Sequence, residues 1–398
     1  MIGGISSLAV WADTLKTGIL AREGRQQYVF AYAANIDNAS AVSLTMPVRL
    51  ESWVSRDLHP VFQMNLPEGA LLEAIRRAIA KLVGDDDLSL LRVTGGNQIG
   101  KNRFSGIGEG CPHDKSENES LDEILTYPDT SELFHELIDR YALRSGISGV
   151  QPKVLLDATD RSTLTSSGYI LKTWGSDYPQ LAANEYFCMT AAQTAGLPVA
   201  DFHLSDNGGL FVMRRFDQHP DGSTLGFEDM CSLQGLGTAQ KYRGSYERIA
   251  KSLKDFVSGE YLQAARKQFF AMLVLSTMVR NGDAHLKNFG VLYPSSQGPV
   301  TMAPVYDVVT TTAYIRNDSP ALSIAGTKKW WNRKMMERFA VTSLNLSIGD
   351  TAEIIERVAD AVMETRLKIP GHMNDHPEFR TIGEAMMTIW EEGVSEFK

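Results

Sequence analysis

Apolar and polar positions in the N-terminal half of the chain follow patterns that predict strands with a few helices. Short runs of β-branched and aromatic residues are typical of strands, whereas apolar residues three to four positions apart are typical of a helix. Before residue 145 these patterns predict strand segments at 28–33 and 44–48 and helices at 68–84, 120–125 and 132–144. The stretch 106–120 is rich in glycine, serine and charge, so it predicts a linker and the first domain boundary.

Two hairpins with a helix between them come next. An apolar run, a polar turn and a second apolar run predict a hairpin over 152–174. The segment 181–196 predicts a helix, because it ends with a glycine that a proline follows two residues later. A second hairpin is predicted over 202–217, since its Asp-Asn-Gly-Gly sequence is typical of a turn.

Helical patterns dominate after residue 228. They predict helices at 245–257, 260–280, 350–366 and 378–396, with a strand-rich insert at 289–309. A β-rich half followed by a mostly helical half is the order of a two-lobed, kinase-like α+β fold. We therefore expect three regions, an N-terminal subdomain at 1–108, a β-rich N-lobe at 109–216 and a helical C-lobe at 217–398.

The composition is that of an ordinary globular protein. Of the 398 residues 43% are apolar and 22% are charged, which excludes a disordered tail, a collagen-like chain and a coiled coil. With 39 basic and 48 acidic residues the net charge is −9, so contact with DNA would need a local basic patch or a partner.

Cysteine use and apolar run lengths indicate a cytoplasmic protein. The three cysteines are far apart and form no CxxC pair, so a disulfide framework and a structural zinc site are not expected. The N-terminus lacks the basic and apolar regions of a secretion signal. The longest apolar run, Phe269 to Val279, is too short to span a bilayer and predicts a buried helix. We expect no membrane contact.

The segment NGDAHLKN at 281–288 carries a candidate phosphoryl-transfer site. Asp283 and Asn288 have the offset of the catalytic aspartate and the metal-binding asparagine in the protein-kinase catalytic loop. Asp283 would orient the attacking hydroxyl, and Asn288 would hold Mg²⁺. The alternative is a solvated turn that follows a helix.

Asp307 is the second candidate metal ligand. It ends a predicted short strand, PVYDVV, from which its carboxylate would meet Asn288 across a nucleotide-bound Mg²⁺. It does not precede Phe-Gly, so it departs from the DFG signature. The alternative is an aspartate that caps the strand.

Two further features point to phosphate binding. Lys172 lies in an apolar strand pattern, where its charge needs a partner, and Glu185 on the next helix is the obvious one. The alternative is an edge-strand lysine that reaches solvent. The turn from Ser148 to Lys153 offers backbone N–H groups to phosphate, although it is neither GxGxxG nor Walker A.

Two other features receive structural interpretations. His285 has no second His or Cys at ligand spacing, so we interpret it as a hydrogen-bonding histidine of the loop. The basic and aromatic cluster at 328–334 is interpreted as a solvated surface, with an anionic partner or a peptide-binding lip as the alternative.

Together these motifs resemble a known family. In this order the chain contains SGISGVQPKVLL, YILKTW, NEYFCM, FVMRRFD, RNGDAHLKNFGVLY and PVYDV. They closely resemble the HipA-type serine/threonine kinases, which are the toxins of bacterial HipA–HipB toxin–antitoxin modules. The resemblance covers about residues 145 to 310 and continues more weakly in the N-terminal region, through LTMPV and the LPEG segment.

The resemblance implies an ATP-dependent, Mg²⁺-using protein kinase that a HipB-like helix-turn-helix antitoxin neutralises. DNA would be contacted only indirectly, because that antitoxin binds operator DNA. Carried onto this sequence, the catalytic residue is Asp283, and the nucleotide-contacting loop includes His285, Lys287 and Asn288. The remaining assignments are the nucleotide and Mg²⁺ pair Tyr306 and Asp307, the phosphate-binding Lys172 with its partner Glu185, the phosphate loop Ser148, Gly149, Val150, Gln151, Pro152 and Lys153, and the adenine hinge Arg214, Arg215 and Phe216.

Two positions depart from the family pattern. Gly146 stands where the family commonly has serine, so Ser148 is the expected autophosphorylation site and Ser145 the neighbouring alternative. Arg214 replaces an acidic residue of some relatives, so adenine contacts there would be made by the backbone.

Our interpretation is a HipA-like protein kinase that phosphorylates a translation factor such as an aminoacyl-tRNA synthetase. The alternatives are a catalytically silent kinase fold that acts as a corepressor or binding module, and a small-molecule phosphotransferase. The set Lys172, Glu185, Asp283, Asn288 and Asp307 is intact, which argues against a silent scaffold.

Overall fold

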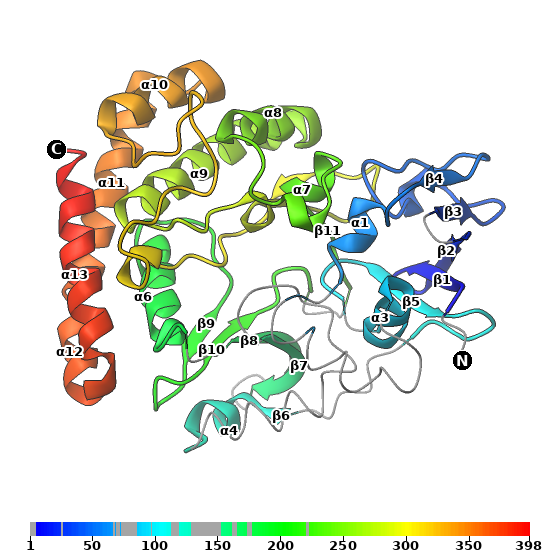
Figure 1. Cartoon of the computed structure of the whole chain (residues 1–398), viewed down its shortest axis with the longest axis horizontal. Helices are drawn as coiled ribbons and strands as arrows, with labels where there is room; N and C mark the ends of the chain where they lie inside the picture. Colours follow the sequence, from blue (N-terminus) through cyan, green and yellow to red (C-terminus); the bar gives the residue numbers. More distant parts are fainter. Residues whose placement is uncertain are drawn as a thin grey trace. The chain divides into compact units, whose positions relative to one another are not determined.

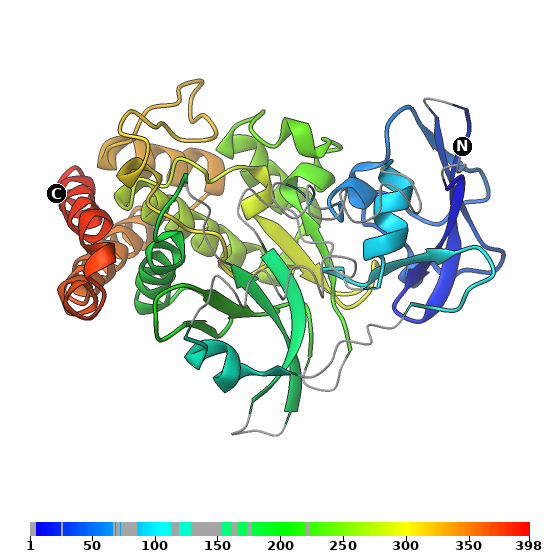
Figure 2. The ribbon, with the colours of Figure 1, turned by 60° about the horizontal axis from the view of Figure 1, so that its bottom comes forward.

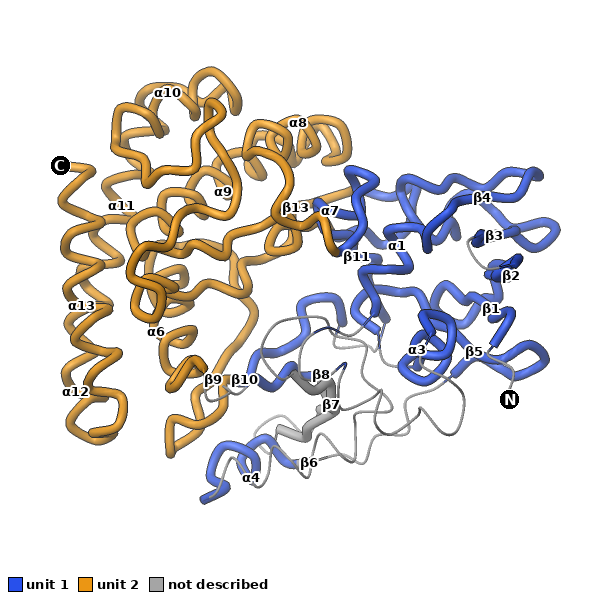
Figure 3. The backbone as a smooth tube through the Cα atoms, in the orientation of Figure 1, with its two compact units in different colours: residues 1–173, 212–238, 292–299 blue, residues 174–211, 239–291, 300–398 orange. Residues whose placement is uncertain are grey.

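The chain forms two compact units, each assembled from three separate segments (Figure 3). The computed structural model describes residues 5–24, 27–66, 68, 72, 86–96, 98–112, 119–128, 153–160, 165–172, 177–219 and 223–398. Unit 1 comprises 1–173, 212–238 and 292–299, and unit 2 comprises 174–211, 239–291 and 300–398. The division into 1–108, 109–216 and 217–398 stays a prediction.

An antiparallel sheet with the strand order β4-β3-β2-β1-β5 begins unit 1 (Figure 1). Its strands are β1 (Ser7–Ala12), β2 (Leu15–Arg22), β3 (Tyr28–Tyr32), β4 (Trp53–Ser55) and β5 (Asn102–Gly106). The short helices α1 (Pro60–Gln63) and α3 (Asp87–Thr94) supply buried side chains to the same core. That core consists of Leu8, Val10, Leu20, Phe30, Val42, Met46, Leu58, Val61, Phe62, Leu88, Leu91 and Phe104.

Only one of the two strands predicted in this region is present in the structure. The strand predicted at 28–33 is confirmed as β3, whereas β1 and β2 were not predicted. The strand predicted at 44–48 is wrong, because Leu44 N–H donates to the distant Glu228 carboxylate and not to a neighbouring strand. The helices predicted at 68–84 and 132–144 fall outside the described residues, apart from Glu68 and Leu72.

Unit 1 also contains the predicted hairpin. Strands β7 (Lys153–Asp160) and β8 (Thr165–Lys172) pair antiparallel over their whole length, and β8 begins four residues earlier than its apolar core suggests. Two further strands flank the hairpin in the order β6-β7-β8-β10: β6 (Glu119–Ser120) lies next to β7, and β10 (Phe211–Arg214) lies next to β8. The short helix predicted at 120–125 is confirmed as α4 (Leu121–Thr126).

A fully buried carboxylate holds the N-terminal sheet to the rest of unit 1. Glu228 lies on β11 (Gly226–Asp229), which helix α7 (Met230–Leu233) follows. Its oxygens accept hydrogen bonds from Ser43 Oγ at 2.7 Å, from Leu44 N at 2.7 Å and from Tyr293 Oη at 2.8 Å. Tyr293 ends strand β12 (Gly290–Tyr293). Burial raises the pKa of Glu228, and the hydrogen bonds that it accepts oppose that rise.

Unit 2 is mostly helical. Its helices are α6 (Leu181–Thr194), α8 (Tyr246–Phe256), α9 (Gly259–Met278), α10 (Arg333–Leu344), α11 (Ile348–Arg366), α12 (Ile369–Asp375) and α13 (Arg380–Ser395). Helix α11 contacts α6, α9, α10 and α13. In Figure 2 the helices at the C-terminal end of the chain, α11, α12 and α13, are orange to red. In α9 and its cap the apolar run from Phe269 to Val279 is buried, as predicted. Within the described ranges, no helix has the length and apolarity to cross a membrane.

The helices predicted at 181–196, 245–257, 260–280, 350–366 and 378–396 are confirmed as α6, α8, α9, α11 and α13. Helices α10 and α12 were not predicted. The turn predicted between 202 and 217 is confirmed, since strand β9 (Phe202–Leu204) leads into it and Ser205 N–H donates to Leu210 O at 2.9 Å. These segments carry strong local signals, a helical period or a glycine-rich turn, which is why the patterns located them.

The predicted strand at 304–309 is mostly wrong. Strand β12 follows the catalytic-loop segment as predicted, but β13 covers only Thr301–Met302. Beyond it, Val305 forms a single bridge with Val199. Asp307 then adopts a left-handed backbone conformation with φ of 56°, which ends the extended segment.

We expect the Glu228→Ala variant to lose about 3 kcal/mol or more of its free energy of unfolding. Three donors would lose their acceptor, those of Ser43 and Tyr293 at buried positions and that of Leu44 at a partly buried one, and a buried donor without a partner costs about 1–3 kcal/mol. Urea unfolding followed by tryptophan fluorescence measures the loss. The control is Glu109→Ala, which removes an exposed carboxylate that lies 2.5 Å from Arg92 Nη2 and is expected to cost less than about 1 kcal/mol. Equal losses in the two variants would contradict this prediction.

Candidate active site

The segment 281–288 turns sharply away from the end of helix α9. Arg280 has a φ of 56°, and the N–H of Asn281 donates back to Ser276 O at 2.8 Å. Asn281 is buried, and its side-chain Oδ1 accepts the Asp283 N–H at 3.1 Å. The turn is therefore held by buried hydrogen bonds, and its first side chain orients the backbone of Asp283.

Position 282 favours glycine because the side chain of Asp318 lies close to its backbone. A Cβ atom at this position would lie 1.9 Å from Asp318 Oδ2, so any other residue would displace that carboxylate. The Gly282 N–H donates to Thr311 Oγ1 at 2.7 Å, and the same hydroxyl lies 2.5 Å from Asp318 Oδ2. The loop is thereby joined to the chain segment that follows Asp307.

Asp283 is the accessible carboxylate of the loop, with a side chain 39% exposed. Tyr242 Oη donates to its Oδ1 at 2.7 Å, and His285 Nε2 lies 4.0 Å from the same oxygen. The rings of Tyr242 and His285 meet edge to face, with 5.0 Å between their centroids. The Tyr242 hydroxyl therefore fixes the carboxylate, His285 packs against Tyr242, and part of the carboxylate stays open to a reacting hydroxyl.

His285 is a buried, neutral imidazole. Its pKa is lowered from 6.5 to about 3, mainly by burial and in part by the nearby Lys241 and Lys287, while Asp307 acts in the opposite direction. The backbone N–H donates to Asn288 Oδ1 at 3.0 Å. Its Nδ1 atom is buried and has no hydrogen-bond partner among the described residues. A bound nucleotide is one group that would satisfy such an atom.

The predicted Mg²⁺ ligands Asn288 and Asp307 lie in the same unit, and their assignment to a metal stays a prediction. Tyr306 Oη donates to Lys287 O at 2.9 Å, which holds the residue before Asp307 against the residue before Asn288. Amide and carboxylate oxygens are the hard donors that Mg²⁺ prefers, and phosphates and water usually complete its octahedron. Throughout the described part of the chain, no three His, Cys, Asp or Glu side chains form a metal-binding group. One amide and one carboxylate are too few for an all-protein cage, so a Mg²⁺ ion held by them would need phosphate or water ligands as well.

A buried asparagine positions the segment that follows Asp307. Asn184 on α6 is fully buried, and its Oδ1 accepts the Thr310 N–H at 2.8 Å while its Nδ2 donates to Thr310 O at 3.1 Å. Trp390 Nε1 donates to the Thr310 hydroxyl at 2.8 Å. Sequence analysis did not single out Asn184, Thr311 or Tyr242, because none of them lies at the motif spacing that marked Asp283.

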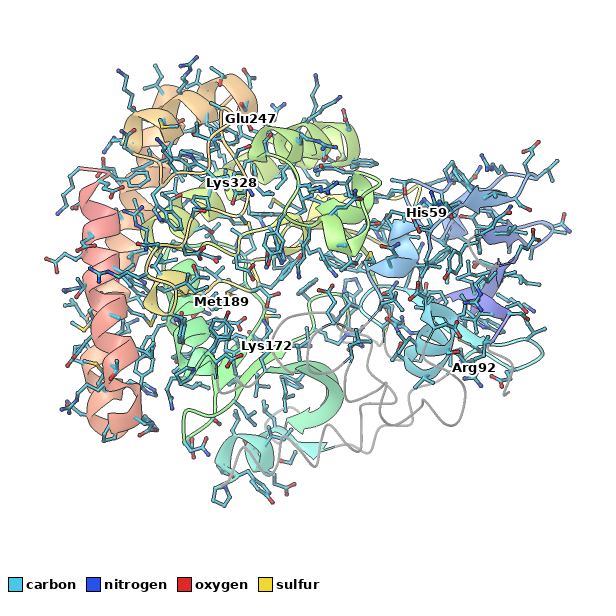
Figure 4. The ribbon with its side chains drawn as sticks, viewed as in Figure 1. His59, Arg92, Lys172, Met189, Glu247 and Lys328 are labelled. Carbon is cyan, nitrogen blue, oxygen red and sulfur yellow. The ribbon has the colours of Figure 1, made fainter. Side chains whose placement is uncertain are left out.

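The predicted Lys172–Glu185 pair stays a prediction, since the two residues belong to different units. Lys172 (labelled in Figure 4) is 2% exposed on β8 in unit 1, and Glu185 is fully buried on α6 in unit 2. Each is a charged group whose burial is costly without a partner. In the predicted phosphate loop Ser148, Gly149, Val150, Gln151 and Pro152 lie outside the described residues, and Lys153 begins β7.

The predicted adenine hinge lies in unit 1, and the side chain and backbone of its middle residue, Arg215, form hydrogen bonds within that unit. Arg215 is buried, and its Nη2 donates to Asp217 Oδ2 at 2.6 Å and to Gln98 O at 2.7 Å. Its backbone N–H donates to Gly168 O at 2.8 Å. Arg214 ends β10, and the ring of Phe216 lies 5.5 Å from that of Phe227. Adenine contact at this segment stays a prediction.

The basic and aromatic cluster at 328–334 divides into two parts. Lys328, Lys329 and Lys334 are exposed, as expected for a solvated surface. Trp331 is 1% exposed and belongs to the core of unit 2, so that interpretation is wrong for this residue.

Comparison with known proteins gives the same family across most of the chain. The family model of the HipA-like C-terminal domain matches residues 145–366, and that of the HipA N-terminal domain matches 8–105. Y4mE of Sinorhizobium fredii, which bears a provisional kinase name, is 30% identical over 77% of this chain and 78% of its own length. Y4dM of the same organism, also provisionally named a kinase, is 31% identical over 47% of this chain, and the match spans only half of its own length, 50%.

The fold matches a solved structure over nearly its whole length. HipA of Shewanella oneidensis MR-1, from a toxin–antitoxin complex with HipB and operator DNA, superposes with a TM-score of 0.71. The match covers 98% of this chain and 97% of that chain at 18% identity. This likeness confirms the α+β fold, with sheets in the N-terminal part and a helical C-terminal part. Together with the two family models, it shows that this chain belongs to the HipA family.

Proposed function

We propose that this chain is an ATP-dependent serine/threonine protein kinase and the toxin of a type II toxin–antitoxin system. The observation that carries the proposal is the geometry around Asp283, where Tyr242 holds a partly exposed carboxylate in the same unit as Asn288 and Asp307. The provisional kinase names of the relatives support it. The proposed substrate is a translation factor such as an aminoacyl-tRNA synthetase.

The chemistry follows from the residues of the loop. Asp283 orients the substrate hydroxyl and accepts its proton, while the neutral His285 packs against Tyr242 and adds no charge beside the carboxylate. Asn288 and Asp307 would hold Mg²⁺, which supplies neutralisation of phosphate charge when bound. Lys172, with Glu185 as its proposed partner, would bind the ATP phosphates.

The proposed regulatory partner is a HipB-like helix-turn-helix antitoxin in the cytoplasm. The support is the likeness to the Shewanella HipA, whose structure was solved with HipB and operator DNA. The net charge of −9 gives the chain itself no general attraction to DNA, so the antitoxin would supply that contact.

We expect Asp283→Asn to lower phosphate transfer about 10²- to 10⁴-fold, the usual contribution of a general base. The amide keeps the size of the side chain and can still accept the Tyr242 hydroxyl, so ATP affinity should be kept. Transfer of labelled phosphate from ATP to the chain itself, and growth arrest on expression, measure the effect. The matched control is Asp360→Asn, the same change at an exposed position of α11. An Asp283→Asn variant that transfers phosphate at the wild-type rate would remove Asp283 from catalysis.

We expect Ser148 to become phosphorylated when the chain is incubated with Mg²⁺ and ATP. A phosphate adds about −1.5 to −2 charges, which would repel the nucleotide from the proposed phosphate loop. Mass spectrometry should find the label on Ser148, and Ser148→Ala should abolish it. Ser148→Asp should weaken ATP binding more than Ser148→Ala does. Phosphate found only on Ser145 or another serine of an active enzyme would refute this site.

We expect acid to destabilise the protein partly through His285. Its pKa is about 3 in the folded chain, against about 6.5 for an unfolded histidine. Between these values only the unfolded chain binds the proton, so the free energy of unfolding falls as the pH drops below about 6.5. His59 and His372, whose pKa burial lowers to about 4, act in the same direction.

Urea unfolding across this pH range should therefore show a shallower loss for His285→Gln than for the wild type. The His285 imidazole should show no titration in the NMR spectrum of the folded protein between pH 5 and 8. A midpoint near 6.5 for this imidazole would contradict the prediction.

A further inference from the structure

Two exposed lysines, Lys328 and Lys329, follow a tight and well-defined turn. Ile324 and Thr327 exchange two backbone hydrogen bonds of 3.1 and 3.0 Å, and between them Ala325 and Gly326 have φ values of 49° and 77°. Two successive positive φ values are typical of a type I′ turn. An alanine rarely adopts this conformation, so its surroundings must hold it there.

Contacts on both sides of the turn hold it in place. Ala325 N–H donates to Glu247 Oε1 at 2.7 Å, and Tyr246 N–H donates to Ser323 O at 3.0 Å. After the lysines, the buried ring of Trp331 packs edge to face against Tyr246, 5.4 Å between centroids. Figure 4 labels both Glu247 and Lys328. A loop fixed at both ends presents its side chains at a low entropic cost of binding.

This loop reaches the residue that holds Asp283. Lys328 Nζ donates to Tyr242 O at 3.4 Å, and the hydroxyl of Tyr242 donates to Asp283 Oδ1 at 2.7 Å. Lys241 Nζ lies 5.6 Å from the centre of the Tyr242 ring. We call Lys241, Tyr242, Lys328 and Lys329 the basic lip. Tyr242 is 42% exposed, so the lip borders the candidate active site at the surface.

The charge of the lip is opposite to that of the chain. The protein as a whole carries a net charge of −9, yet Lys328 and Lys241 both lie against Tyr242, which bonds to the carboxylate that would receive a substrate hydroxyl, and Lys329 directly follows Lys328. A protein segment that brings a serine to Asp283 approaches the exposed Tyr242 and the lysines in contact with it. Fixed positive charges at such a place attract carboxylates and disfavour other positive charges.

We propose that the basic lip selects acidic protein segments, so that the enzyme phosphorylates serine or threonine flanked by aspartate or glutamate. The inference rests on the proposed kinase function and deepens it by naming the substrate class. The anchored turn supplies the geometry, and Lys328 and Lys329 supply the charge that distinguishes one segment from another.

Matched synthetic peptides test the proposal on the full-length chain. Each peptide carries one serine, with glutamate, glutamine or lysine at the same flanking positions. Phosphate transfer from labelled ATP should follow the order glutamate, glutamine, lysine, with the difference mainly in KM. The preference should shrink as salt is raised, because exposed charges are screened.

Substitutions that remove or reverse the lysine charges test whether the basic lip causes the preference for glutamate-flanked peptides. Lys328→Ala and Lys329→Ala should each reduce the glutamate-over-glutamine preference about two- to fivefold, the usual range for an exposed charge pair. Lys328→Glu combined with Lys329→Glu should reverse it. The matched control is Lys334→Glu, an exposed lysine on the first turn of α10, which should keep the wild-type preference. Thermal melting of every variant shows that it is folded.

The possible outcomes separate this inference from the proposed function. A wild-type chain that labels neither itself nor any peptide refutes the kinase function. A wild-type chain that labels itself but shows no preference among the peptides refutes the lip while the kinase function stands. Loss of preference in Lys334→Glu as large as in Lys328→Glu also refutes the lip. Competition by single-stranded RNA that Lys328→Glu abolishes, without any peptide preference, would assign the lip to nucleic acid and overturn the proposal.

Discussion

The hydroxyl of Thr311 is the contact on which the candidate active site depends. It accepts the N–H of Gly282, in the loop that carries Asp283, and it lies on the segment that carries Asp307. Asn184 fixes the neighbouring Thr310 through both of its backbone polar groups. Because a buried polar group without a partner is costly, these bonds leave the loop and the segment one arrangement relative to each other. The carboxylates of Asp283 and Asp307, which we propose for phosphoryl transfer, are thus positioned through groups that have no proposed part in the reaction.

Local patterns were sufficient for much of the fold and failed where distant residues decide the conformation. Helix α9 was recognised because its apolar run is continuous, and the β7–β8 hairpin because two apolar runs surround a polar turn. The segment 44–48 has the composition of a strand, but Leu44 bonds to a carboxylate 184 residues away. No window of sequence contains that information.

In the candidate site, too, some features can be read from the local sequence and others depend on distant residues. Asp283 and Asn288 lie in one loop, so their spacing can be read from the sequence, and the catalytic function that it suggests stays a prediction. Tyr242 is 41 residues from Asp283, and Thr311 is 29 residues from Gly282, so only the folded chain brings them to the loop. Gly282 belonged to the recognised motif, yet the reason for it, the close approach of Asp318, is a tertiary one.

The interleaving of the two units has a consequence for synthesis on the ribosome. Unit 1 lacks its last segment until residues 292–299 have been made, although its first segment ends at residue 173. At roughly 5 to 20 residues per second the nascent chain waits on the order of 10 s between these points. During that time the N-terminal sheet can fold, but Glu228 still lacks the hydroxyl of Tyr293. A truncated translation product that ends before residue 292 would therefore carry an incomplete unit 1, however much of unit 2 it already contains.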